Sequence, residues 1–159
     1  MTELVKPTLK DIPQMMSLVE NEIKNGTILY RSEDEIATNI RSYVVVKDGD
    51  SILAYGALHI HSPDLAEIRS LIVGEEYRGK SLGTKIVNYA IGEAERLKIK
   101  KILVLTYIPQ FFTKLGFNEI PKESIPDHKI WADCIKCIHF PVCNEVSLMY
   151  DIESKSDNI

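Results

Sequence analysis

A loop rich in cations and glycines lies in the middle of the chain, after a predicted strand that ends at Val73. It reads Arg78-Gly79-Lys80-Ser81-Leu82-Gly83-Thr84, and a predicted helix follows it. The start of a helix has unpaired backbone N–H groups and a partial positive charge, and glycines let an anion come close to them. The pattern therefore predicts a phosphate or pyrophosphate site to which Arg78 and Lys80 add cationic donors. An ordinary turn with two solvated cations is the alternative.

The strand before this loop carries a carboxylate and a guanidinium. Glu67 and Arg69 are two residues apart, so together with Leu71 they should lie on one face of the strand. A strand carboxylate can act as a general base, and it can equally form an ion pair with a neighbour on the same face. The residues alone leave both roles open.

An arginine in a predicted loop and a tyrosine at a strand end are further candidates. The planar guanidinium groups of Arg31 and Arg69 would each suit a carboxylate, although most arginines are surface residues. Tyr107 follows a predicted strand at its carboxyl end, where open α/β sheets present ligand-binding groups. Its ring can equally serve packing alone.

The spacing of apolar residues predicts the elements that hold these side chains. We expect strands over residues 2–7, 43–46, 52–60, 65–73, 101–106 and 145–152, and helices over 12–24, 33–40, 83–97 and 109–116. An Asp-Gly step between the second and third strands favours an antiparallel hairpin. The helix over 83–97 joins two apolar strands, which is typical of a parallel crossover. The sequence therefore predicts an α/β (α+β) fold with a mixed sheet flanked by helices.

Composition limits the class of protein. There are 19 Lys and Arg residues against 23 Asp and Glu, a formal net charge of −4, so no diffuse basic field would attract nucleic acid. No apolar run approaches the ~20 residues that a membrane span needs. We expect one globular domain over residues 1–152 with a polar tail over 153–159. The first residues lack a signal-peptide pattern and three cysteines cannot all pair, so the cytoplasm is the expected location.

At the loop the chain resembles the GNAT acetyltransferase family. The acetyl-CoA loop of that family has Arg or Gln, two residues, Gly, one residue, and Gly or Ala; here Ser81 stands at the first of the two glycine positions. The predicted order of elements matches the GNAT fold over the whole chain. The resemblance implies that acetyl-CoA is a cosubstrate, with its pyrophosphate on residues 78–84. Its pantetheine arm would lie along Leu71, Ile72 and Val73, and Phe112 would belong to the cofactor site.

The same resemblance suggests roles in catalysis. In GNAT enzymes the position of Glu67, six residues before Val73, often carries the base that deprotonates the substrate ammonium. Phe112 stands where many relatives have a Tyr that protonates the leaving thiolate. The hydroxyl of Tyr107 is our candidate for that missing acid.

Three segments resemble N-acetylglutamate synthases, a GNAT subgroup with short single-domain members. They are residues 26–32 with Arg31, residues 103–107, and residues 129–143. This resemblance implies transfer of acetyl to the α-amine of L-glutamate in arginine biosynthesis, with Arg31 and Arg69 orienting the two carboxylates. The alternatives are another small amine, a protein amine, or a non-catalytic acyl-CoA sensor. The expected partners are these small molecules, neither nucleic acid nor membrane, and the sequence leaves a homodimer open.

Three cysteines close together raise the question of a metal. Cys134, Cys137 and Cys143 give a C-x2-C-x5-C pattern, with His128 and His139 nearby as further ligands for zinc. Three thiols in a reduced protein can equally be buried packing groups. The metal site therefore stays unassigned from sequence.

Overall fold

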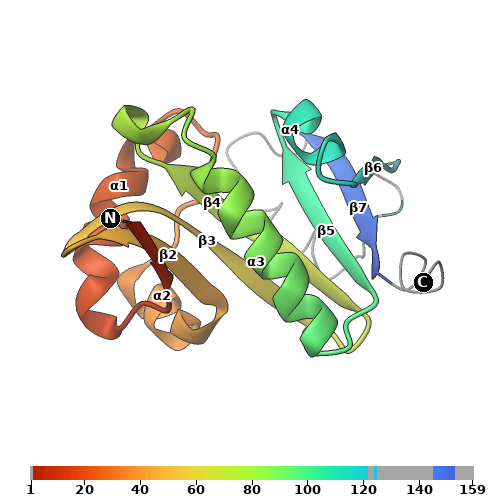
Figure 1. Ribbon diagram of the computed structural model, residues 1–159, viewed down its shortest axis with the longest axis horizontal. Coiled ribbons are helices and arrows are strands. Elements are labelled where there is room, and N and C mark those ends of the chain that lie inside the picture. Colours follow the sequence, from red (N-terminus) through yellow and green to blue (C-terminus); the bar gives the residue numbers. More distant parts are fainter. Residues whose placement is uncertain (1, 122–123, 125–144, 153–159) are drawn as a thin grey trace. The chain divides into compact units, whose positions relative to one another are not determined.

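The protein is described here by a computed structural model that covers residues 2–121, 124 and 145–152. Its strands are β1 (Thr2–Val5), β2 (Tyr43–Asp48), β3 (Ser51–Ser62), β4 (Leu65–Val73), β5 (Lys101–Thr106), β6 (Asn118–Glu119) and β7 (Val146–Asp151). Its α-helices are α1 (Ile12–Lys24), α2 (Glu33–Thr38), α3 (Leu82–Arg96) and α4 (Pro109–Thr113) (Figure 1). The strands form a seven-stranded sheet in the order β1-β2-β3-β4-β5-β7-β6.

This architecture confirms the predicted mixed sheet with flanking helices. β2 and β3 pair antiparallel across a turn in which Gly49 has φ +61°, as the Asp-Gly step predicted. β4 and β5 pair in parallel, with Glu67 opposite Leu103. β7 runs antiparallel to β5 as the closing strand. The two-residue β6, which pairs with β7, was not predicted because two residues carry no alternating pattern.

Two compact units divide the chain. The first unit holds Met1–His59 and Ile68–Gly92, and the second holds Ile60–Glu67 and Glu93–Ile159. Strands β3 and β4 contribute residues to both units. We describe the units one at a time.

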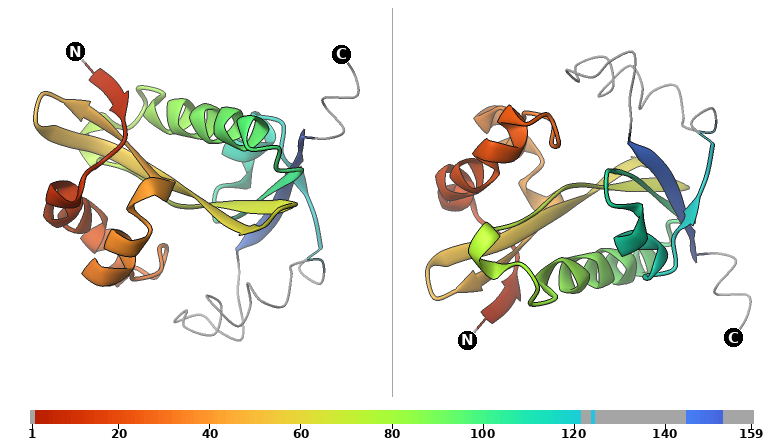
Figure 2. Two further views of the ribbon diagram at one scale, coloured as in Figure 1. Left: turned by 90° about the horizontal axis from the view of Figure 1, so that it is seen from below. Right: turned by 90° about the horizontal axis from the view of Figure 1, so that it is seen from above.

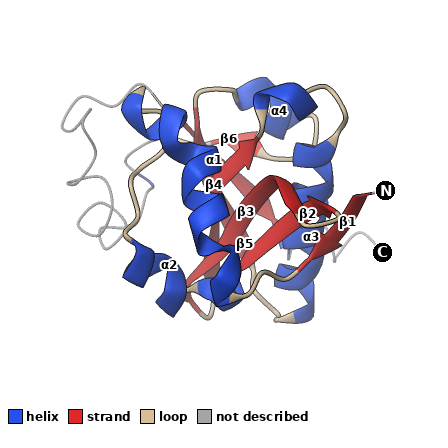
Figure 3. Ribbon diagram, turned by 90° about the vertical axis from the view of Figure 1, so that its left-hand side faces the viewer, coloured by secondary structure: helices blue, strands red, loops and turns tan. Residues whose placement is uncertain are grey.

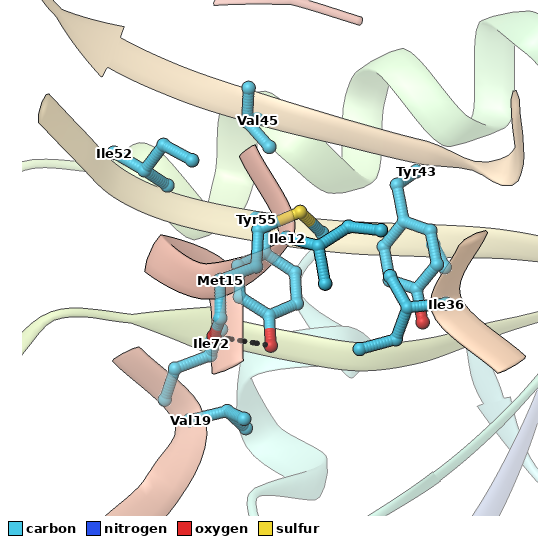
Figure 4. Close-up of a cluster of buried hydrophobic side chains, with 10 residues drawn as sticks. Ile12, Met15, Val19, Ile36, Tyr43, Val45, Ile52, Tyr55 and Ile72 are labelled. Atoms are coloured by element: carbon cyan, nitrogen blue, oxygen red, sulfur yellow. Dashed lines mark hydrogen bonds between the residues drawn. The ribbon is translucent and has the colours of Figure 1, made fainter. Parts of the chain in front are cut away.

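The first unit has two hydrophobic layers on the two faces of β2 and β3. Helices α1 and α2 lie on one face and α3 lies on the other, which Figures 2 and 3 show from several sides. Alternate residues of β2 supply both layers. Tyr43 and Val45 pack with α1 residues such as Met15 (Figure 4), whereas Val44 and Val46 pack with Leu82 and Ile86 of α3. The β-branched run of β2 therefore reflects burial on both faces.

Strand β4 changes face at Ser70. Ser70 has φ +58°, a conformation that non-glycine residues rarely adopt in a strand. Beyond it, Ile72 packs in the layer that contains Tyr43, while Leu71 and Val73 pack in the layer that contains Val44. Arg69 acts electrostatically on Tyr43, so it belongs to the Tyr43 side. The prediction that Leu71 shares a face with Arg69 was wrong, because the backbone at Ser70 breaks the alternation on which it rested.

The second unit is built around β5 and β7. Leu65, Leu103, Leu105, Ile120 and Met149 pack together on one side of these strands. Phe112 of α4 is 2% exposed and packs edge-on against Phe111 and Phe117, with ring centroids 4.9 and 5.4 Å apart. This aromatic cluster anchors α4 in the second unit. Tyr107 lies in the short connection between β5 and α4.

Candidate functional site

Glu67 forms a buried contact with His61 in the second unit. The Glu67 carboxylate Oε1 lies 2.9 Å from Nε2 of His61 on β3, and the two side chains are 3% and 4% exposed. Both residues flank the turn between β3 and β4, so they are close in sequence as well as in space. A carboxylate that is almost fully buried needs a donor to remain ionised, and Nε2 of His61 lies where a protonated ring nitrogen would supply one.

A second contact to a histidine lies in the first unit. The Arg69 guanidinium is 2.9 Å from Nδ1 of His59, at the position two residues before His61 on β3. Sequence reasoning did not identify either histidine. The signal was present, because His59-x-His61 and Glu67-x-Arg69 have the same two-residue spacing on the strands before and after the turn between β3 and β4. Each histidine contacts one member of the second pattern, His61 with Glu67 and His59 with Arg69.

Arg31 and Arg69, the two arginines predicted to bind carboxylates, both act electrostatically on Tyr43 in the first unit. Burial raises the pKa of the Tyr43 phenol, whereas the charges of Arg31 and Arg69 and a hydrogen bond with the Ser70 side chain oppose that rise. The charges of both guanidinium groups therefore act on one phenol. Tyr43 is 5% exposed, and its side chain lies beside Ile36 in Figure 4. Residue spacing alone did not reveal Tyr43, since it sits in an apolar strand that predicts core packing.

The loop before α2 determines where Arg31 lies. Ser32 caps α2 by accepting a hydrogen bond from the Glu35 N–H at 3.1 Å, which confirms the predicted start of that helix. Arg31 precedes this cap, and its guanidinium lies 3.0 Å from the Glu35 carboxylate. The Arg31 side chain is 10% exposed, so it is far more buried than a typical surface arginine.

The predicted phosphate loop precedes α3 as expected. Gly79 and Ser81 have φ of +83° and +63°, and α3 begins at Leu82. Ser81 thus adopts the left-handed conformation that the missing glycine of the GNAT pattern would adopt. The loop residues before α3 are exposed, namely Gly79, Lys80 and Ser81. Lys80 Nζ lies 5.9 Å from the centre of the Tyr77 ring.

Arg78 makes two contacts within the first unit that the sequence did not predict. Its Nε donates to the Val73 carbonyl at 3.2 Å, and its guanidinium lies 2.9 Å from the Glu22 carboxylate of α1. These contacts tie the loop to the end of β4 and to α1. Arg78 is therefore placed to brace the loop, and Lys80 is an exposed cation shortly before the start of α3.

Tyr107 and Phe112 belong to the second unit. Tyr107 is 37% exposed directly after β5, at the carboxyl end of the strand as predicted. Phe112 is packed in the aromatic cluster described above. Leu71, Ile72 and Val73 end β4 in the first unit, and Thr84 lies in the first turn of α3.

No metal site emerges from residues 2–121, 124 and 145–152, where no three His, Cys, Asp or Glu side chains are grouped to hold an ion. Cys134, Cys137, Cys143, His128 and His139 lie outside the described residues. The polar tail over 153–159 lies outside them as well. Among the helices that the structure describes, none is long and apolar enough to cross a membrane.

Comparisons with known proteins were made for sequence and for structure. The chain is 33% identical over 141 residues to an uncharacterized N-acetyltransferase of Chlorobaculum tepidum, covering 89% of this chain and 90% of that protein. It is 27% identical over 124 residues to the amino-acid acetyltransferase of Pasteurella multocida and 29% identical over 119 residues to that of Mycobacterium tuberculosis. These matches cover 77% and 69% of this chain but only 28% and 64% of the two relatives.

Solved structures show the same fold. N-acetylglutamate synthase from Neisseria gonorrhoeae, solved with coenzyme A and N-acetyl-glutamate, matches with a TM-score of 0.80 at 18% identity over 95% of this chain and 35% of its own. A Mycobacterium tuberculosis protein solved in complex with CoA matches with a TM-score of 0.80 at 20% identity, covering 94% of this chain and 99% of that one. The sequence model of the acetyltransferase (GNAT) family matches residues 10–117. The chain therefore belongs to the GNAT family of acetyltransferases.

Proposed function

We propose that this acetyltransferase moves the acetyl group of acetyl-CoA to the α-amine of L-glutamate. The observation that carries the proposal is that the charges of two guanidinium groups, those of Arg31 and Arg69, both act on the buried phenol of Tyr43. Two adjacent guanidinium groups suit an acceptor with two carboxylates, because each planar fork can form paired hydrogen bonds with one of them. Structural similarity to an N-acetylglutamate synthase is compatible with this acceptor.

In this proposal Glu67 is the general base. A substrate ammonium must lose a proton before its nitrogen can attack, and a carboxylate within reach, directly or through one water, can accept that proton. The N–H bond of the ammonium breaks as an O–H bond forms on Glu67. The amine then attacks the acetyl carbonyl and the C–S bond breaks. The CoA thiolate takes a proton from an acid, and the second proton lost by the nitrogen as it becomes an amide returns to that acid. Tyr107 is our candidate for that acid, since Phe112 has no proton to give.

Acetyl-CoA would bind along the end of β4 and the loop before α3. The backbone N–H groups of residues 79–84 and the start of a 15-residue helix would favour the pyrophosphate. Lys80 would add a charge, and Arg78 would hold the loop in shape from Val73 and Glu22. The backbone of Leu71 to Val73 would line the pantetheine arm and Phe112 the acyl end. Positioning of this kind supplies much of the rate enhancement of a direct transfer.

Thiol release from acetyl-CoA across a panel of acceptors tests the proposal. The panel contains L-glutamate, L-glutamine, L-aspartate, L-lysine, a polyamine and a peptide with a free N-terminus. We expect thiol release with glutamate and a fall on the order of 10²-fold or more in turnover for Glu67→Gln, with acetyl-CoA affinity unchanged. A protein that binds CoA but releases no thiol with any acceptor would be an acyl-CoA sensor instead. Preference for lysine, a polyamine or a peptide would reject glutamate as the acceptor.

A further inference from the structure

His61 is a buried histidine on β3 for which the transfer chemistry above has no use. Its side chain is 4% exposed, and its Nε2 lies 2.9 Å from Oε1 of Glu67, whose side chain is 3% exposed. Histidines that only fill space near a surface are rarely this buried together with a carboxylate. The pair therefore requires an explanation in terms of what one group does for the other.

Two physical consequences follow from this contact. A carboxylate taken out of water favours its neutral form unless donors stabilise the charge, and a neutral carboxyl cannot accept a proton from the substrate. A hydrogen bond from Nε2 to Oε1 stabilises the charged form. It also restricts the rotation of the carboxylate and so directs Oε2, the other oxygen, toward whatever occupies the site.

The surroundings of Glu67 on the neighbouring strands are apolar. Leu103, opposite Glu67 on β5, and Met149, opposite Leu103 on β7, are uncharged side chains of the second unit. Tyr107 is the titratable residue that follows β5, and Arg69 is the cation two residues further along β4. His61 is an ionisable group within hydrogen-bond distance of Glu67.

We propose that His61 is a positioning residue that holds the Glu67 carboxylate ionised and aimed at the acceptor amine. The inference rests on the proposed function of Glu67 as the base. It adds the residue on which the pH range of that base depends.

Two variants of similar polarity separate a positioning role from a packing role. His61→Gln keeps an N–H donor near the place of Nε2, whereas His61→Asn is shorter and leaves Oε1 without that donor. Ile60→Gln, at a half-exposed neighbouring position on β3, controls for effects on the strand itself. The assay is kcat/KM for L-glutamate at saturating acetyl-CoA, from about pH 5 to about pH 9, with the full chain.

We expect His61→Asn to move the acidic limb of this profile upward by about 1 to 2 pH units. Its kcat at neutral pH should fall on the order of 10-fold to 100-fold. His61→Gln should keep the limb within about half a unit of the wild type, and Ile60→Gln should leave the whole profile unchanged. KM for acetyl-CoA should be the same in all four proteins.

Each other outcome overturns the inference. A folded His61→Asn protein with the wild-type limb and kcat would show that Glu67 does not depend on His61. Where His61→Asn does not fold, His61→Gln decides alone, and a loss as large as that of Glu67→Gln would reject the positioning role. Glu67→Gln tests the base separately: if that variant stays active, the proposed function fails, whereas an inactive Glu67→Gln with a normal His61→Asn rejects only the role of His61.

Discussion

Replacing Ser81 by glycine should stabilise the protein without weakening CoA binding. Ser81 has φ +63° in the loop before α3, a conformation that costs a non-glycine residue about 1 to 2 kcal/mol. Glycine relieves that cost but loses about 0.5 to 1 kcal/mol through the greater freedom of the unfolded chain. From the middle of the two ranges, the net gain in the free energy of unfolding is about 0.75 kcal/mol. For a chain of this size the gain corresponds to a rise in Tm of roughly 1 to 4 °C.

A matched control exists at the other end of α3. Lys98 has φ +66° after the helix, where the Ile99 N–H donates to the Ala94 carbonyl at 3.0 Å and the Lys98 N–H donates to the Glu95 carbonyl at 3.1 Å. This is a helix end that favours glycine. Lys98→Gly should give a similar rise in Tm and, because it is remote from the loop in sequence, leave CoA affinity alone.

The assays are thermal unfolding without ligand and CoA binding by calorimetry for the wild type and both variants. Ser81→Gly should bind CoA within about threefold of the wild-type affinity, since the N–H groups of the loop keep their direction. A fall in Tm for Ser81→Gly beside a rise for Lys98→Gly would contradict the left-handed conformation at Ser81. A large loss of CoA affinity in Ser81→Gly would show that the serine hydroxyl, not the loop backbone, binds the cofactor.

Three further predictions concern the cofactor, the acceptor and alkaline stability. Gly83→Val, at a buried position in the first turn of α3, should weaken CoA binding on the order of tenfold or more by placing a branched side chain where the pyrophosphate approaches; unchanged affinity would reject the site. Arg31→Lys should raise the KM for glutamate by about tenfold while the KM for acetyl-CoA stays constant, since an ammonium cannot form the bidentate contact; steady-state kinetics check both constants. Burial raises the pKa of Tyr55, whose hydroxyl donates to the Met15 carbonyl at 3.2 Å, so the unfolded chain loses this proton at lower pH than the folded protein does. The stability that this tyrosine contributes is therefore present below about pH 10 and declines above it, and Tyr55→Phe should flatten the alkaline part of a urea-unfolding series; an equally steep decline in Tyr55→Phe would disprove the assignment.

Most of the fold was predictable because its elements have strong local patterns. Strand β4 and strand β5 have the predicted bounds, since most of their residues are apolar and polar residues flank them. Helix α2 begins after Ser32, whose side chain makes the predicted cap. The two-residue β6 has no such pattern, because only its pairing with β7 defines it.

Features that depend on one backbone angle were not predictable in the same way. The reversal of face at Ser70 places Leu71 in a different layer from the one that alternation predicts. A serine gives no signal of a positive φ, in contrast to a glycine. The same limit applies to Ser81, for which the sequence left the conformation undecided.

The charged residues of the candidate site were predicted from the sequence, but their partners were not. Glu67, Arg69 and Arg31 stand out because charges are unusual in apolar strands and because of the family resemblance. Glu67 and Arg69 have histidine partners on the preceding strand, and Tyr43 lies in an apolar strand that predicts core packing. The charges of Arg31 and Arg69 both act on Tyr43, and Arg78 binds Glu22 of α1, 56 residues before it. Only the packing of the chain brings such groups together.

The proposed choice of acceptor is tested most directly by competition in a single reaction. Purified protein is given limiting acetyl-CoA with equal concentrations of L-glutamate and L-glutamine, and the two acetylated products are quantified by mass spectrometry. Their ratio equals the ratio of the two kcat/KM values. Glutamine keeps the shape of glutamate but leaves one guanidinium without its carboxylate, so we predict a ratio on the order of 10² or more in favour of N-acetyl-L-glutamate. A ratio near one, or acetylation of neither amino acid, would contradict the proposal that Arg31 and Arg69 select glutamate.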